Sequence, residues 1–286
     1  MVTLPAMDLM MMALPLFGLL MLAEATLTSL RGHNVYTLRD FGGSMSQLGI
    51  NILVRLALGG AIIGLHLFLY RFRIFEVPRG PLGWLITFIV IDFVFYWYHR
   101  ASHRVRFLWC AHVVHHSSEH MNLGTALRQS PTGPFTKALF YWPLPLLGFD
   151  PLVIASAGAL ATLYGFWTHT QVIKKLWAPL EWLFVTPSHH RAHHGSNPEY
   201  VDRNYGNFLI VWDRLFGTFQ PEVAPVRYGL ISNIDTYNPL KIAFAEWLRL
   251  LRDSLATASL GQLWQLWLRP PRGQPQTLAG AEAAHE

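Results

Sequence analysis

Residues 99–116 read HRASHRVRFLWCAHVVHH and place five histidines directly after an apolar segment. His99 and His103 are four residues apart, and His112, His115 and His116 follow with the spacing H-x-x-H-H. Residues three and four apart share one face of a helix, so each set can direct its imidazoles to one side. This segment therefore predicts helices that present a cluster of metal ligands.

The spacing H-x-x-H-H occurs a second time, further along the chain. It recurs at His190, His193 and His194, and His169 stands alone between the two copies. Neutral imidazole binds zinc, copper, iron and nickel, so the ligand type does not select a metal. A structural zinc site uses four ligands, whereas nine histidines fit two metals. The candidate ligands are His99, His103, His112, His115, His116, His169, His190, His193 and His194.

The composition is that of a membrane protein. The 286 residues are 52% hydrophobic and 14% charged, whereas soluble domains carry about 25% charged residues. The net charge of +5 comes from scattered basic residues, so we expect no nucleic-acid partner. The single cysteine, Cys110, excludes a disulfide framework and a thiolate-rich metal site.

Three apolar segments are long enough to cross a bilayer, which takes roughly 20 residues. They run over about 7–30, 47–70 and 81–98. Two shorter segments, 134–149 and 151–167, flank a turn signal. We therefore expect an all-α integral membrane protein with about four transmembrane helices, or three plus a helical hairpin.

The histidines set the expected topology and domain division. If both histidine clusters form one site, an even number of crossings separates His116 from His169, and we place that site in a cytosolic helical cap. We expect N-terminal transmembrane helices in 1–80 and a catalytic domain in 81–220. An amphipathic helical region is expected in 221–269 and a disordered tail in 270–286.

Polar residues near the clusters are candidates to hold the imidazole rings or to add a ligand, since metal-bound histidines usually donate their second N–H. Asp92 lies seven residues before His99 on the same helical face, and a carboxylate in an apolar span is a functional candidate. We expect His33, His66 and His285 to play no part. The supporting candidates are Asp92, Glu119, His120, Asn122, His189, Asp202 and Asn204.

These motifs carry a family resemblance. Residues 90–220, with Trp97-Tyr98-His99, Thr186-Pro187-Ser188-His189-His190 and Trp212-Asp213, resemble the fatty acid hydroxylase/sterol desaturase superfamily of membrane di-iron oxygenases, and most of all its alkylglycerol monooxygenase branch. One position departs from that branch, because Arg104 stands where its members carry an acidic residue. The resemblance implies a transmembrane stem under a cytosolic cap, with two irons held by the nine histidines.

The implied chemistry is O2-dependent hydroxylation, or desaturation, of an aliphatic C–H bond in a membrane lipid. Such bonds resist side-chain acids, bases and nucleophiles, so a redox metal is required. The electrons come from outside, from a reductase partner or a tetrahydropterin. Zinc can occupy the same nitrogen sites in a purified protein. The sequence does not predict the lipid, the carbon position or the oligomeric state.

Two other functions fit a membrane-bound histidine cluster. One is a zinc-dependent lipid hydrolase or amidase, although the H-E-x-x-H motif of many zinc peptidases is missing. The other is a non-enzymatic metal transporter or receptor. Transporters place ionisable groups in the middle of the membrane, whereas these histidines flank the apolar segments.

Overall fold

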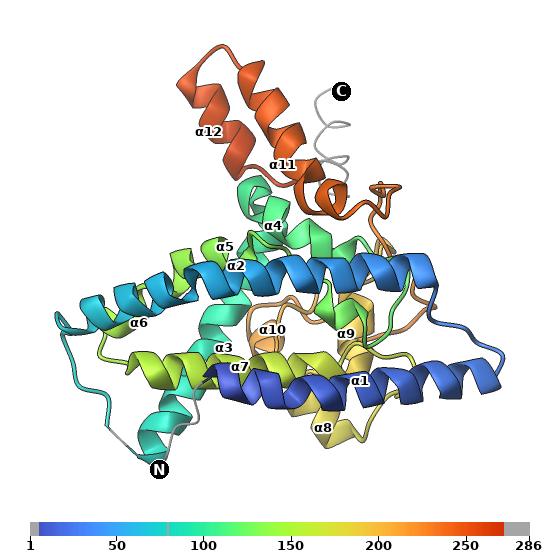
Figure 1. Ribbon diagram of the computed structural model, residues 1–286, viewed down its shortest axis with the longest axis horizontal. Helices are drawn as coiled ribbons and strands as arrows, with labels where there is room; N and C mark the ends of the chain where they lie inside the picture. Colours follow the sequence, from blue (N-terminus) through green and yellow to red (C-terminus); the bar gives the residue numbers. More distant parts are fainter. Residues whose placement is uncertain (1–5, 79, 272–286) are drawn as a thin grey trace.

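The computed structural model describes residues 6–78 and 80–271, and their regular secondary structure is helical (Figure 1). Within these residues no strand forms, and two isolated β-bridges join Phe184 to Leu209 and Gly195 to Tyr228. A helix satisfies its own backbone hydrogen bonds, which an apolar environment demands. The predicted all-α fold is therefore confirmed.

Three helices are long and apolar enough to cross a membrane, as the sequence predicted. They are α1 (Ala6–Leu30), α2 (Leu38–Tyr70) and α3 (Pro81–Arg104). The helix α2 begins nine residues before the predicted start, because Thr37 caps it by accepting a hydrogen bond from the backbone N–H of Asp40. Its first turns carry the buried polar residues Ser44 and Gln47, which pack against protein and escape a search for apolar segments.

The helix α3 extends beyond the apolar segment that predicts it. It continues for six residues past Tyr98 and so carries both His99 and His103 on its last turns. Pro81 at the first helical position fixes its start. One continuous helix thus joins an apolar segment to the first histidine pair.

Both arms of the predicted hairpin form. The first arm consists of α5 (Gly133–Tyr141) and α6 (Pro143–Leu146), and the second is α7 (Pro151–Trp167). Gly148 turns the chain between them with φ +94°, and a Cβ at this position would lie 2.1 Å from the carbonyl oxygen of Phe75. Asp150 then caps α7 by accepting from the N–H of Leu152 at 2.9 Å.

Helices far apart in the sequence lie side by side around this hairpin. Figure 1 shows α1 and α7 running alongside each other below α2, while α3 crosses behind them. Phe17 of α1 stacks on Phe166 of α7 with ring centroids 3.7 Å apart. Ile91 of α3 and Ile154 of α7 are buried in a second apolar cluster. These contacts fix the end of α7, directly before His169.

Short helices and loops fill the region between the ends of the long helices. They carry most of the histidines, and the loop-rich segment between Thr168 and Phe219 folds back onto α3. The short elements are α4 (Arg106–His116), η1 (Thr125–Leu127), α8 (Ala178–Leu183), α9 (Pro187–His193) and α10 (Val211–Leu215).

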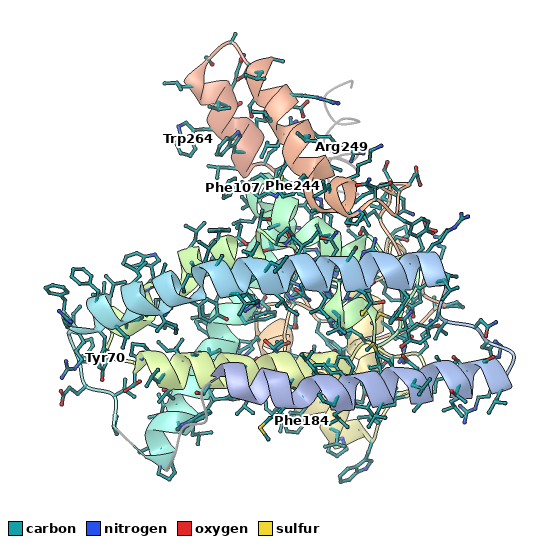
Figure 2. The ribbon with its side chains drawn as sticks, viewed as in Figure 1. Tyr70, Phe107, Phe184, Phe244, Arg249 and Trp264 are labelled. Carbon is teal, nitrogen blue, oxygen red and sulfur yellow. The ribbon has the colours of Figure 1, made fainter. Side chains whose placement is uncertain are left out.

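A helical hairpin follows, formed by α11 (Pro239–Leu255) and α12 (Leu260–Leu268). It stands out from the body in Figure 2, where Phe107 marks its base and Trp264 its outer side. Phe107 of α4 stacks on Trp267 with centroids 5.3 Å apart, whereas Trp264 is 63% exposed. Both helices lie within residues 221–269. The predicted tail at 270–286 lies outside the described residues from 272 onward.

Candidate metal centre

The nine candidate histidines gather into two neighbouring groups. In each group every member offers one ring nitrogen, and these nitrogens lie within 4.8 Å of one another. The rings of His116 and His194, one from each group, stack with centroids 4.4 Å apart. The five-histidine group consists of His99, His103, His112, His116 and His193, and the four-histidine group of His115, His169, His190 and His194.

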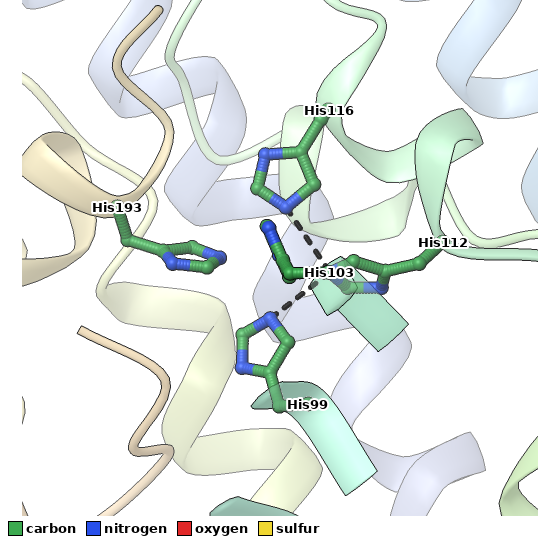
Figure 3. A group of neighbouring side chains, drawn as sticks. All are labelled: His99, His103, His112, His116 and His193. Atoms are coloured by element: carbon green, nitrogen blue, oxygen red, sulfur yellow. Dashed lines mark hydrogen bonds between the residues drawn. The ribbon is translucent and has the colours of Figure 1, made fainter. Parts of the chain in front are cut away.

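The five-histidine group combines three helices. His99 and His103 come from α3, His112 and His116 from α4, and His193 from α9. Figure 3 shows their rings converging on one central space from all sides. The Nε2 of His112 lies 2.9 Å from that of His99 and 3.1 Å from that of His116.

The four-histidine group is equally compact. The Nε2 of His169 lies 2.8 Å from that of His190 and 3.1 Å from that of His115. The Nε2 of His194 lies 3.2 Å from that of His190. His169 directly follows α7, while the other members come from α4, α9 and the residue that ends α9.

The two H-x-x-H-H motifs contribute to the groups in opposite ways. The outer pair of the first motif, His112 and His116, joins the five-histidine group, while His115 between them joins the other group. In the second motif the outer pair enters the four-histidine group, and the residue between them, His193, enters the first. An i,i+4 pair shares one face of a helix, and the residue between points aside. Each motif therefore bridges both groups.

Three histidines have their tautomers fixed by backbone carbonyls. The Nδ1 of His99 donates to the carbonyl of Tyr205 at 2.8 Å, that of His169 to Gly165 at 2.7 Å, and that of His193 to Arg203 at 2.8 Å. A carbonyl only accepts, so the proton is assigned to Nδ1 and the Nε2 lone pair is left free. All three lone pairs therefore belong to ring nitrogens that can bind a metal.

Burial favours the neutral form of those imidazoles that do not lie on the three long apolar helices. It lowers the pKa of His169 from 6.5 to about 4. Burial, followed by the neighbouring imidazoles, also lowers the pKa of His112, His115, His190 and His194 well below the usual value. A metal needs the neutral ring, so these residues are in the ligating form near neutral pH.

The residues present fit a pair of metal ions. The Nε2 of His193 is buried and has no hydrogen-bond partner, and a metal would satisfy it. Neither group contains a carboxylate or a thiolate. Nitrogen-only sites suit iron, zinc, copper and nickel alike, so the geometry accepts two ions without identifying them.

Among the predicted supporting side chains, Asp202 lies next to a histidine of the groups. Its Oδ1 is 3.7 Å from the Nδ1 of His103, and its Oδ2 accepts from Arg104 at 3.0 Å. Arg104 thus anchors this carboxylate beside the five-histidine group.

Asp202 and Asn204 also act through the backbone. Both adopt left-handed conformations, with φ of 61° and 57°, which Asp and Asn tolerate better than most residues. Between them lies Arg203, whose carbonyl accepts from His193. The side chain of Asn204 donates to the carbonyl of His189 at 3.0 Å. The loop is thereby bent so that one carbonyl faces the five-histidine group.

The other supporting candidates bond away from the nine histidines. Asp92 accepts from the backbone of Phe208 and Leu209 and from the Trp212 indole, and so holds the loop behind His99. The remaining contacts join Glu119 to Asn233, His120 to Thr37, Asn122 to Val35 and His189 to Glu181. His66 is buried in α2 and His33 is exposed, both outside the two groups, and His285 lies outside the described residues.

Sequence reasoning did not identify Asp213 as a supporting residue. Its carboxylate accepts from the N–H of Tyr205 and of Gly206, both at 2.7 Å, and from Thr218 at 2.6 Å. The carbonyl of Tyr205 in turn accepts from His99. Asp213 therefore positions His99 through one backbone residue. No short spacing relates the two, so only the fold reveals the connection.

A second network missed by sequence reasoning supports α4. Arg128 pairs with Asp40 at 3.0 Å and donates to the carbonyl of Val114 and to Ser117 at the end of the helix. Glu24 of α1 accepts from the N–H of Leu123 at 2.8 Å and from Thr170, next to His169. The first two long helices thus hold the segments that carry the histidines.

The chain thus combines three helices long and apolar enough to span a membrane with two groups of histidines that could each hold a metal ion. Residues 84–218 match the sequence model of the fatty acid hydroxylase family. This range contains all nine histidines. No solved structure matches the chain.

Similar proteins include alkylglycerol monooxygenases. That of Xenopus tropicalis is 42% identical over 203 residues, which cover 69% of this chain and 45% of that protein. That of Homo sapiens is 41% identical over 243 residues, covering 83% and 54% respectively. Ornithine lipid hydroxylase OlsE of Rhizobium tropici is 33% identical over 165 residues, covering 56% and 50%. The chain thus spans about half the length of these relatives.

Proposed function

We propose that the protein is a membrane monooxygenase that hydroxylates an aliphatic C–H bond of a lipid, with one iron in each histidine group. The observation that carries the proposal is the pair of adjoining nitrogen-only groups inside a fatty acid hydroxylase domain. Similar chains named as alkylglycerol monooxygenases and as an ornithine lipid hydroxylase support a lipid substrate.

Iron supplies the redox chemistry that no side chain provides, namely the activation of O2 against an unactivated C–H bond. In the overall reaction one oxygen atom enters the C–H bond and the other leaves as water. An external donor supplies two electrons, and two protons come from solvent. Removal of a second hydrogen, in place of oxygen insertion, would yield an alkene. The donor is a reductase partner or a reduced pterin.

In this proposal the protein's own residues bind the metal ions and fix the orientation of the histidine ligands. His99, His169 and His193 keep their Nε2 lone pairs directed inward because backbone carbonyls hold the opposite nitrogen. Eight of the nine histidines are buried and His112 is half-buried, which restricts bulk water around the site. Asp213 fixes the carbonyl that orients His99. Neither group contains a carboxylate, the general base that accompanies the metal ligands in H-E-x-x-H zinc hydrolases, which disfavours a hydrolase of that type.

The arrangement also suggests the orientation in the membrane. We place α1, α2 and α3 across the bilayer as the stem and the two histidine groups on the cytosolic side, where soluble reductants are available. The lipid would then enter from the bilayer between apolar helices. A cysteine-scanning label applied from either side of sealed vesicles, with probes at Ser46 and Arg73, would test this orientation.

Labelling with ¹⁸O2 tests the proposed reaction. Membranes containing the wild-type protein, an electron donor and cellular lipids should form a lipid that carries one ¹⁸O atom. The His115→Ala variant should form none, while the His33→Ala control should match the wild type. Product that takes its oxygen from H2¹⁸O, or full turnover without O2, would exclude a monooxygenase. A product lighter by two hydrogens would identify a desaturase.

A further inference from the structure

A polar pocket borders both histidine groups. It is lined by His112 of the five-histidine group and His115 of the four-histidine group, together with Arg55 of α2 and Lys137 of α5. Its free volume is about 20 Å³, which holds roughly one water molecule. Arg55 lines the pocket and is also exposed, so a larger ligand could contact it from outside the pocket.

Two cations meet at this pocket without a counter-ion. The Nε of Arg55 donates to the amide oxygen of Asn51 at 2.7 Å, and the ammonium of Lys137 lies 5.2 Å from the ring centroid of Phe95 and 5.9 Å from that of Tyr98. Among the residues that the structure describes, no carboxylate forms an ion pair with either cation.

Three other arginines, which unlike Arg55 are buried, form ion pairs with carboxylates. Arg106 pairs with Glu246 and Asp253, Arg128 with Asp40, and Arg191 with Glu222. Arg55 sits instead in the middle of an apolar helix, where an ionisable residue is functional by default. Because Arg55 and Lys137 line the same pocket, their like charges repel each other. An anion bound between them would relieve that repulsion.

The remaining lining is suited to such an anion. Asn51, Gln129 and Ser130 add amide and hydroxyl groups to the pocket. Arg55 presents a planar fork of donors, which suits a phosphate or carboxylate, and Lys137 adds a point charge. A neutral lipid head group would leave both cations unpaired at the edge of an apolar region.

We propose that Arg55 and Lys137 bind the anionic head group of the lipid substrate, so that the enzyme prefers acidic lipids over neutral ones. This assignment rests on the proposed function, because it specifies the class of lipid that the same site would bind. Because the pocket also reaches His112 and His115, the head group would be held close to both histidine groups. Phosphate and carboxylate share the required chemistry.

Three lipids with the same C16 chain distinguish a phosphate head group from a carboxylate and from a neutral head group. They are hexadecylglycerol 3-phosphate, palmitate and neutral hexadecylglycerol. Binding to the iron-loaded protein in nanodiscs is measured without O2 or an electron donor, so the result does not depend on turnover. The wild type should bind at least one acidic lipid more tightly than the neutral one by about tenfold or more, since charge-assisted hydrogen bonds are the strong ones. The more tightly bound acidic lipid identifies the head group.

The matched variants are Arg55→Gln and Lys137→Gln, singly and combined, with Arg252→Gln on the exposed side of α11 as the control. Each single variant should reduce the preference for the acidic lipid, and the double variant should abolish it, while the neutral lipid binds as before. Equal binding of all three lipids by the wild type would overturn the proposal. So would an unchanged preference in a double variant that retains its iron and its melting temperature.

If ¹⁸O2 labelling shows no hydroxylation while the double variant loses its lipid preference, the proposed reaction fails and the anion site stands. If hydroxylation occurs but the wild type shows no preference for acidic lipids, the proposed reaction stands and the anion site fails.

Discussion

The five-histidine group and the four-histidine group share two helices, α4 and α9, but their other members come from different parts of the chain. The first group adds His99 and His103 from α3, a helix long enough to span the membrane. The second adds only His169, directly after the shorter α7. The carboxylate of Asp202 lies beside the first group, and no carboxylate in the described residues is paired with a member of the second.

This difference shows how one motif serves two sites. Each H-x-x-H-H sequence gives its i,i+4 pair to one group and its intervening histidine to the other. Neither group can therefore form unless α4 and α9 pack in register. The groups are separable only through the residues that they do not share, which are the histidines of α3 and His169. Substitutions at those positions distinguish the two sites.

The largest expected effect is the loss of a ligand. His169→Ala should remove iron from the four-histidine group, and His99→Ala should weaken iron binding to the five-histidine group, because each change deletes a nitrogen whose tautomer is fixed. Both should abolish hydroxylation, since the proposed reaction needs both irons. Iron analysis of each variant, with His33→Ala as control, checks this. Near-normal turnover in either variant would show that its histidine is not a ligand.

Removal of both metals should destabilise the protein. A ligand present at a thousand times its dissociation constant stabilises the native state by about 4 kcal/mol. Thermal unfolding of the protein, followed before and after chelation and after iron is restored, measures the effect. A melting temperature unchanged by chelation would mean that the buried histidines hold no metal. The His169→Ala variant should show a smaller shift than the wild type because it has less metal to lose.

A smaller effect is expected from a change at Asp213, which should lower the iron affinity of the five-histidine group alone. Asp213→Asn weakens the hydrogen bonds that fix Tyr205, whose carbonyl orients His99. Changes at residues that orient metal ligands lower metal affinity by about tenfold or more. The loss of iron affinity should appear in the His169→Ala background, where only the five-histidine group is complete. It should be absent in the His99→Ala background. Asp235→Asn, on an exposed loop, is the matched control.

The smallest expected effect concerns Arg104. Its ion pair with Asp202 is partly exposed, with 37% of the arginine side chain accessible, and such pairs contribute about 1 kcal/mol or less. Arg104→Gln should therefore weaken iron binding to the five-histidine group by a few-fold at most. Arg100→Gln, on the same helix, provides the comparison. A complete loss of iron in Arg104→Gln would show that Asp202 is itself a ligand that depends on this pairing.

Spacing indicated which histidines could lie together, but not how they divide between two groups. Periodicity alone indicates that His112, His115 and His116 lie on nearby helical faces, and the structure gathers all nine candidates. Their division into five and four depends on how α4 and α9 cross, which local sequence does not determine. The three apolar helices were predictable because a run of about 20 apolar residues is itself the signal.

The supporting residues were harder to predict because they act across long stretches of sequence. Asn204 and Asp202 lie near the second motif, and their left-handed backbone is what aims the Arg203 carbonyl. Asp213 reaches His99 across more than 100 residues and through a backbone group. Backbone acceptors leave no trace in residue type, so a search for polar side chains near the histidines found Asp202, which lies beside His103, but missed Asp213.

Turnover as a function of bound iron tests the central claim most directly. Metal-free protein is loaded stepwise with Fe(II) without oxygen, and the O2-dependent formation of hydroxylated lipid is then measured at each iron-to-chain ratio. If each histidine group holds one iron and both are needed, activity should rise as the second iron binds and reach its maximum at about two irons per chain. Full activity at one iron per chain, or with zinc alone, would contradict the account.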